Sequence, residues 1–226
     1  LPGTSSKVRG IQSQGSATDI TLRNLTFDCL EYGIKIDGTG NSGWDVDGIS
    51  MPEGTTSQGV RMPVFMQGTT NSTFRDMNLW ANSVETGDHH FYISNGCSNL
   101  TFTNIECIGG VGHVFHLYGA TEESPSSDLT FTNVRIINPA WYGIHISEYY
   151  TRCVFNGVYR TCTSMGGAAW VQFYGATSSN LVTDFLFKTT GGGTSYFLFN
   201  QVAAGNTPNT ISNGKMYNSR ISGDGL

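Results

Sequence analysis

The sequence predicts an all-β protein, a single right-handed parallel β-helix of about eight coils. Helical patterns are nearly absent, and short alternating runs rich in Thr, Val, Ile, Phe and Tyr favour strands. The segment NLTFTNIECI at 99–108 also recurs as DLTFTNVRII at 128–137. Repeats of this length cannot bury an apolar face alone, so neighbouring repeats must stack into a solenoid.

The repeat runs along nearly the whole chain. The second residue of each copy falls at positions 20, 44, 72, 100, 129, 153, 181 and 210, which are separated by 24, 28, 28, 29, 24, 28 and 29 residues. Each repeat also contains a second short strand, such as GIKI at 33–36, GVRM at 59–62 and GIHI at 143–146. We therefore expect residues 1–226 to form one β-helix domain. Because the last repeat is unfinished, we expect a fragment of a longer chain.

Two columns of equivalent residues support stacking in register. We call the second residue of each copy its marker. Two places after each marker the side chains are apolar, and we expect them to form one inward column: Leu22, Val46, Phe74, Phe102, Phe131 and Phe155. Four places after the marker the residues are small or amide-bearing, and we expect a ladder of turns: Asn24, Gly48, Asp76, Asn104, Asn133 and Gly157. Asn and Gly tolerate a left-handed backbone, and an Asn amide can bond to the next coil.

Composition excludes several classes of function. The net charge of −5, from 12 Lys and Arg against 17 Asp and Glu, disfavours a nucleic-acid partner. The apolar runs are too short for a membrane span. The five cysteines, at positions 29, 97, 107, 153 and 162, include no CxxC pair and are expected to be buried free thiols. No metal site is expected from these cysteines.

The repeated units with the pattern LTFTNI…GIHI resemble the parallel β-helix superfamily that includes pectate lyases, other polysaccharide lyases and phage tailspike depolymerases. The resemblance covers the chain from Lys7 to Asn218. It implies the fold, and it implies activity only weakly, because the shared motifs are structural and a fold hosts many functions. It also implies a trimer. Because the ends of a short solenoid would expose strand edges, we expect neighbouring segments of the same fibre or partner chains there.

A row of outward residues is the candidate site. In the second strand of each coil the flanking residues point inward and the middle residue points outward. This predicts a row of outward side chains, one from each coil and about 5 Å from the next. The row consists of Gln12, Lys35, Arg61, Tyr92, His116, His145, Gln172 and Leu198. Trp170 and Trp141 are placed beside this row. The alternative interpretation is an ordinary solvated strand surface.

The composition of the row suits a polysaccharide that carries acid groups. Aromatic rings stack on sugar rings, amides bond to hydroxyls, and Lys and Arg pair with carboxylates. We therefore expect substrate binding by seven residues: Lys35, Arg61, Tyr92, His116, His145, Gln172 and Trp170.

Two catalytic routes are open if the chain is an enzyme. In β-elimination on a uronate, a base removes a proton while a cation stabilises the developing charge. Lys35 and Arg61 resemble the Lys/Arg pairing of some β-helix lyases, although both also fit solvated surface cations. His116 or His145 could serve as base, and Tyr92 as the acid.

The second route is glycoside hydrolysis, which needs two carboxyl groups. Asp88, in the segment GDHHFY, and Glu148 are the candidates, although Asp88 also fits a hydrogen-bonded loop. No cofactor or metal ligand set is predicted. Calcium would require acidic ligands, and Asp37, Asp45 and Asp47 are only loose candidates without a recognisable ligand spacing.

Three functions remain open at this level. The first is a polysaccharide-binding, and potentially polysaccharide-degrading, β-helix of a phage tailspike or another extracellular appendage. The second is a secreted lyase acting on uronate-containing glycans, and the third is a non-catalytic structural or adhesive rod. All three would place the chain outside the cell or on a virion surface.

Overall fold

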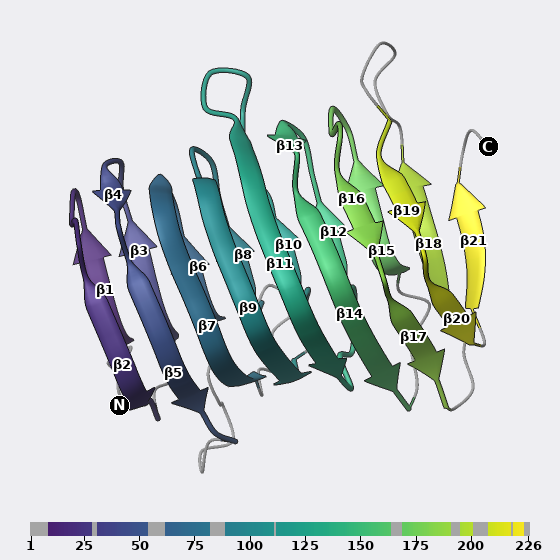
Figure 1. Ribbon diagram of the computed structural model, residues 1–226, viewed down its shortest axis with the longest axis horizontal. Helices are drawn as coiled ribbons and strands as arrows, with labels where there is room; N and C mark the ends of the chain where they lie inside the picture. Colours follow the sequence, from purple (N-terminus) through teal and green to yellow (C-terminus); the bar gives the residue numbers. More distant parts are fainter. Residues whose placement is uncertain are drawn as a thin grey trace, which may run out of the picture.

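The computed structural model describes residues 9–28, 31–53, 62–81, 89–110, 112–163, 169–190, 195–200, 208–217 and 219–223. All the regular elements in these ranges are β-strands, and the strands form two parallel sheets that lie one behind the other (Figure 1). No helix that could cross a membrane occurs in these ranges. The fold is therefore a parallel β-solenoid, consistent with a β-helix superfamily.

Sheet A has nine strands, and strands that are adjacent in the sheet follow one another in chain order. Its strands are β1 (Arg9–Gln14), β3 (Tyr32–Asp37), β6 (Met62–Met66), β8 (Phe91–Ile93), β10 (Phe115–Leu117), β12 (Ile144–Ile146), β15 (Ala169–Tyr174), β18 (Ser195–Asn200) and β21 (Ser219–Gly223). Strands β1 and β21 lie at opposite ends of the solenoid (Figure 1).

Sheet B carries the longer strands. They are β2 (Thr21–Thr26), β4 (Asn41–Ser42), β5 (Asp45–Met51), β7 (Thr69–Ala81), β9 (Ser98–Gly109), β11 (Ser126–Ile137), β13 (Tyr150–Thr151), β14 (Val154–Cys162), β16 (Leu181–Thr183), β17 (Leu186–Thr189), β19 (Thr210–Ser212) and β20 (Lys215–Tyr217). The solenoid has about six turns, a small difference from the eight coils expected. Towards the C-terminal end sheet B is divided into the short strands β16, β17, β19 and β20.

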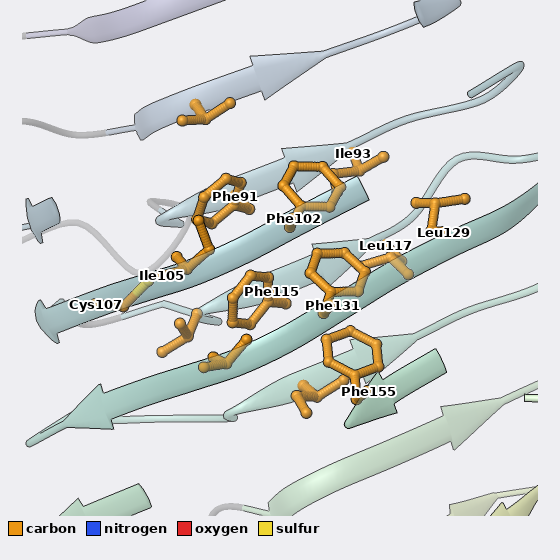
Figure 2. Packing of buried hydrophobic residues seen from close by; sticks show 14 of the residues in the cluster. Phe91, Ile93, Phe102, Ile105, Cys107, Phe115, Leu117, Leu129, Phe131 and Phe155 are labelled. Atoms are coloured by element: carbon orange, nitrogen blue, oxygen red, sulfur yellow. The ribbon is translucent and has the colours of Figure 1, made fainter. Parts of the chain in front are cut away.

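The core lies between the two sheets, and aromatic stacks run through it. Phe102 and Phe131 stack with ring centroids 4.5 Å apart, and Phe131 and Phe155 stack at 4.1 Å. Phe115 of sheet A meets the Phe131 ring edge-on at 5.1 Å (Figure 2). The expected inward column is confirmed, since its six members pair in register from β2 to β14.

The expected turn ladder is also confirmed. All six of its residues have positive φ, from 51° at Asn24 to 70° at Gly157. The Asn104 amide donates to Asp76 Oδ1 at 2.8 Å, and the Asn133 amide donates to Asn104 Oδ1 at 2.7 Å. A Cβ added at Gly48 would lie 2.5 Å from Asn24 Oδ1, so a larger residue at this place would have to displace the Asn24 side chain.

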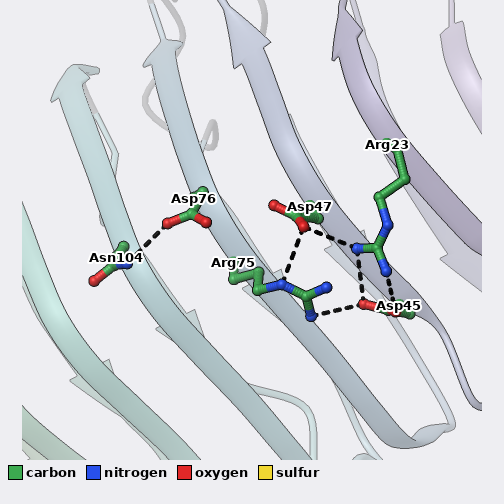
Figure 3. Close-up of polar contacts among 6 residues, drawn as sticks. All are labelled: Arg23, Asp45, Asp47, Arg75, Asp76 and Asn104. Atoms are coloured by element: carbon green, nitrogen blue, oxygen red, sulfur yellow. Dashed lines mark hydrogen bonds and ion pairs between the residues drawn. The ribbon is translucent and has the colours of Figure 1, made fainter.

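The outer face of sheet B is a surface of ion pairs. Arg23 and Arg75 both bind Asp45 and Asp47, with a distance of 2.8 Å from Arg75 to Asp45 and 3.1 Å from Arg75 to Asp47 (Figure 3). Further along the face, Arg135 pairs with Glu106 at 2.7 Å and Arg152 with Asp128 at 2.6 Å. Opposite charges on neighbouring coils thus neutralise one another on this side.

Four of the cysteines, at positions 97, 107, 153 and 162, are free and buried, as expected. Burial raises the pKa of Cys97 and Cys153 to about 12, so both thiols stay protonated. Cys29 lies outside the described residues.

Candidate functional site

The outward row exists on sheet A and is in register. Tyr92 pairs with His116, His116 with His145, and His145 with Gln172. At the other end Gln12 pairs with Lys35. Since parallel strands lie about 4.8 Å apart, these side chains follow one another at one-coil intervals.

One place in the row differs from the expectation. Phe65, rather than Arg61, pairs with Lys35 and with Tyr92. The strand expected at 59–62 lies at Met62–Met66, because Val64 and Met66 supply the two buried flanking residues. Arg61 itself lies outside the described residues.

Because Phe65 stands where the cation of Arg61 was expected, this part of the row is aromatic. Phe65 and Tyr92 stack with centroids 5.5 Å apart, and Tyr32 meets Phe65 edge-on at 5.8 Å. The ammonium of Lys35 lies 5.2 Å from the centroid of Tyr32 and 5.3 Å from that of Phe65. It also pairs with Asp37 at 2.9 Å. Lys35 is therefore held by an ion pair and by cation–π contacts.

Exposed aromatic residues continue the row beyond Tyr92. Tyr118 follows β10, Trp141 precedes β12, and Tyr174 ends β15, with exposed fractions of 47%, 38% and 43%. Tyr118 and Tyr174 contact the rings of His116 and His145 respectively. We use the name aromatic face for the surface formed by Tyr32, Phe65, Tyr92, His116, Tyr118, Trp141, His145 and Tyr174.

Four imidazoles gather at the centre of the aromatic face. The histidine cluster consists of His89, His113, His116 and His145. His116 Nδ1 lies 2.9 Å from His89 Nε2, and His145 Nδ1 lies 3.4 Å from His113 Nε2. The backbone N–H of His113 donates to His89 Nδ1 at 3.0 Å. Neutral His89 therefore carries its proton on Nε2 and donates it to His116.

Burial keeps these rings neutral. It lowers the pKa of His89 and His145 to about 4 and that of His113 to about 2, and it lowers the pKa of His116 further. Repulsion between neighbouring imidazolium charges adds to the shift at His89, His113 and His116. A neutral imidazole can accept a proton or bind a metal ion.

Two nitrogen atoms of the cluster lack hydrogen bonds. His113 Nδ1 and His145 Nε2 are buried and have no partner among the described residues. A buried polar group without a partner costs about 1–3 kcal/mol. Among these residues, His89, His113 and His116 also form the one group of three or more metal-binding side chains, with ligand atoms within 4.8 Å of one another.

His90 is the fifth histidine and has a different role. It is buried, and its Nε2 lies 3.1 Å from the carbonyl oxygen of Ile108. Burial lowers its pKa to about 4 as well. His90 therefore joins a coil of sheet A to β9 and does not belong to the cluster.

Trp170, expected to bind substrate, is fully buried and stacks on Phe187 at 5.0 Å. The guanidinium of buried Arg160 lies 4.1 Å from the ring centroid of Trp170. Strand β15 has a register shift at this place, which interrupts the alternation of side chains. Trp170 and the next residue, Val171, therefore both point inward. It is a core residue and cannot contact a ligand on the outer face.

The remaining predicted residues are dispersed. Gln172 is in the row but nearly buried, and Glu148 is exposed and packs over Gly175. Asp88 lies outside the described residues. The three loose calcium candidates are engaged elsewhere, since Asp45 and Asp47 pair with arginines and Asp37 pairs with Lys35.

Sequence reasoning missed Phe65 as a member of the row, and it missed His113 altogether. His89, His113 and Tyr142 each stand three places before the outward residue of their coil. In the structure this position forms a second outward column, in which His89 and His113 stack at 5.0 Å and His113 lies 4.9 Å from Tyr142. Aligning the coils at this position would have brought both histidines together.

Comparisons with protein-family models, curated proteins and solved structures found no match to this chain. The structure shows a parallel β-solenoid, which is consistent with a β-helix superfamily.

Proposed function

We propose that the chain binds a polysaccharide along the aromatic face of sheet A. The observation that carries this proposal is the unbroken succession of rings from Tyr32 to Tyr174 at one-coil intervals. Flat rings offer apolar contact to the C–H surfaces of sugars, and adjacent imidazole and phenol groups can hydrogen-bond to hydroxyls. A linear array of such groups fits a linear polymer.

The distribution of exposed rings favours this face over the other. Tyr118, Trp141 and Tyr174 are three of the five large exposed hydrophobic side chains among the described residues. Sheet B instead presents ion pairs. An exposed apolar patch with polar groups beside it is typical of an interaction site.

The aromatic face suggests that stacking contributes more than charge. Two described cations lie beside its Tyr32 ring, and both are already paired, Lys35 with Asp37 and Arg9 with Glu31. We therefore propose a glycan partner without requiring acid groups in it. A polysaccharide-binding solenoid of this kind would suit a tailspike or another extracellular appendage.

Binding to immobilised neutral and uronate-containing polysaccharides tests the proposal. Trp141→Ala and Tyr118→Ala should weaken binding at least tenfold, about 1.4 kcal/mol. Tyr159→Ala is the matched control, because Tyr159 lies on sheet B and is as exposed as Trp141, at 38%. Equal loss in all three variants, or no binding to any polysaccharide, would overturn the proposal.

The same samples distinguish binding from cleavage. β-Elimination leaves an unsaturated product that absorbs in the near ultraviolet, whereas hydrolysis yields reducing ends without that absorbance. If product forms, Tyr92→Phe and His145→Gln test the acid and base roles expected from the sequence. Binding without either product identifies a binding module.

A further inference from the structure

We propose that His89, His113 and His116 bind a divalent transition-metal ion of the zinc type. Two coils supply the ligands: His89 lies two residues before β8, His113 lies two residues before β10, and His116 lies within β10. The stacking of the coils brings one nitrogen of each ring within 4.8 Å of the others. This arrangement requires nothing of the glycan proposal and stands or fails separately.

The distances are near those that an ion of this size requires, and the rings would have to move to meet them. Zinc–nitrogen bonds of about 2.0–2.1 Å in tetrahedral geometry place ligand nitrogens about 3.3 Å apart. His116 Nδ1 and His89 Nε2 are 2.9 Å apart, and the largest separation in the group is at most 4.8 Å. An ion bound by His89 Nε2 would require the neutral ring to carry its proton on Nδ1 instead, and the backbone N–H of His113 would then give up its bond to that nitrogen.

The cluster also contains an unsatisfied donor atom. His113 is 6% exposed, and its buried Nδ1 has no hydrogen-bond partner among the residues that the structure describes. Its Nε2 lies 3.4 Å from Nδ1 of His145. A neighbouring polar group of this kind orients a metal-binding histidine. His145 therefore acts as a positioning residue for His113.

The donor set selects the kind of metal. Imidazole nitrogen suits zinc, copper and nickel, whereas calcium and magnesium prefer oxygen ligands. Within the described ranges no carboxylate joins the three histidines. The rings are already neutral at pH 7, because burial lowers the pKa of His89 to about 4 and that of His113 to about 2.

Three protein ligands leave one position of a tetrahedral ion open. The rings around the site are those of the aromatic face: Trp141 stacks on His113 at 5.0 Å, and Tyr118 lies 5.0 Å from His116. His116 and Tyr118 both retain contact with solvent. The open position therefore lies on the outer face of the solenoid, where a water molecule or an oxygen of a bound molecule can enter.

Titration calorimetry of the chelator-treated chain with zinc chloride tests this proposal, with calcium chloride as the comparison ion. We expect one zinc ion per chain and no saturable calcium binding. His116→Gln and His113→Gln should each lower zinc affinity at least tenfold. His90→Gln is the matched control, since it removes a histidine of the same region outside the ligand set, and it should leave the affinity unchanged.

A second measurement guards against misfolded variants. Electron paramagnetic resonance of the Cu²⁺-loaded chain should show splitting from three nitrogens, with one fewer in His116→Gln, and circular dichroism should show an unaltered β spectrum. Absence of saturable zinc binding by the unmodified chain would overturn the proposal. So would equal zinc affinity in His116→Gln, His113→Gln and the unmodified chain. Zinc binding with no glycan binding would overturn the proposed function alone.

Discussion

His116 Nδ1 lies 2.9 Å from His89 Nε2, although 27 residues separate the two along the chain. The contact arises because one turn of the solenoid returns the chain to the neighbouring strand of sheet A. Polar groups that are distant in sequence thus form a largely buried cluster on an otherwise aromatic surface.

Acid should destabilise the metal-free chain at a higher pH than the carboxylates alone would. Burial lowers the pKa of His90 and His145 to about 4 from the usual 6.5. The unfolded chain therefore binds more protons between these values, so stability is complete above about pH 6.5 and is lost as the pH falls towards about 4. A shift of about 2.5 units corresponds to about 3 kcal/mol for one such histidine.

Urea unfolding in the presence of chelator at pH 7 and pH 5 measures this effect. The rings in contact with His145 are those of His113, His116, Tyr118, Tyr142 and Tyr174, and none of them is a carboxylate. Arginine lowers the pKa of Asp45 and Asp128, so these carboxylates titrate below the same window. The His145→Gln variant should lose less stability than the unmodified chain between the two pH values, and an equal loss would contradict the prediction.

Truncation of the central phenylalanine stack should be costly. Phe131 is fully buried and contacts Phe102, Phe115 and Phe155. Phe131→Ala leaves a cavity in the core and should lower the free energy of unfolding by about 3–5 kcal/mol. Phe131→Leu should cost about 1 kcal/mol. Chemical denaturation compares the two, and similar losses would show that the cavity collapses.

The turn ladder separates backbone conformation from side-chain bonding. Asn104 has a φ of 56° and bonds to Asp76 and Asn133. Asn104→Gly keeps the backbone conformation and loses only the amide bonds, whereas Asn104→Ala also introduces the left-handed penalty of about 1–2 kcal/mol. Thermal melts should therefore rank the unmodified chain above the Gly variant and the Gly variant above the Ala variant. If Ala and Gly melt together, φ does not limit stability here.

Much of the fold was predictable because it depends on a period. The Phe102 and Asn104 columns repeat with side chains that suit only an inward or a left-handed position, so a single alignment placed them correctly. Phe65, and not the expected Arg61, takes the place between Lys35 and Tyr92 for a related reason. The segment VRMPVFM supports alternation in two registers, and only the packing of Val64 and Met66 against the core selects one.

The candidate site was predictable only in part. Tyr92, His116 and His145 follow from strand alternation and stand where it placed them. His89 and His113 lie outside the strands, so their convergence depends on the path of the turns and on burial. The inward direction of Trp170 could not be predicted either, because it depends on a register shift in β15 that turns this ring into the core.

Matching registers make the solenoid modular. Leu100 and Leu129 are partners in adjacent strands, so excising the 29 residues from 100 to 128 would join two coils that already share an alignment. The shortened molecule would lose about 4.8 Å of length together with His113 and His116. It would bring Tyr92 beside His145, and it would also remove Tyr118 and the acidic partners of Arg135 and Arg152. Whole-coil deletion is thus a way to remove His113 and His116 together while keeping the scaffold.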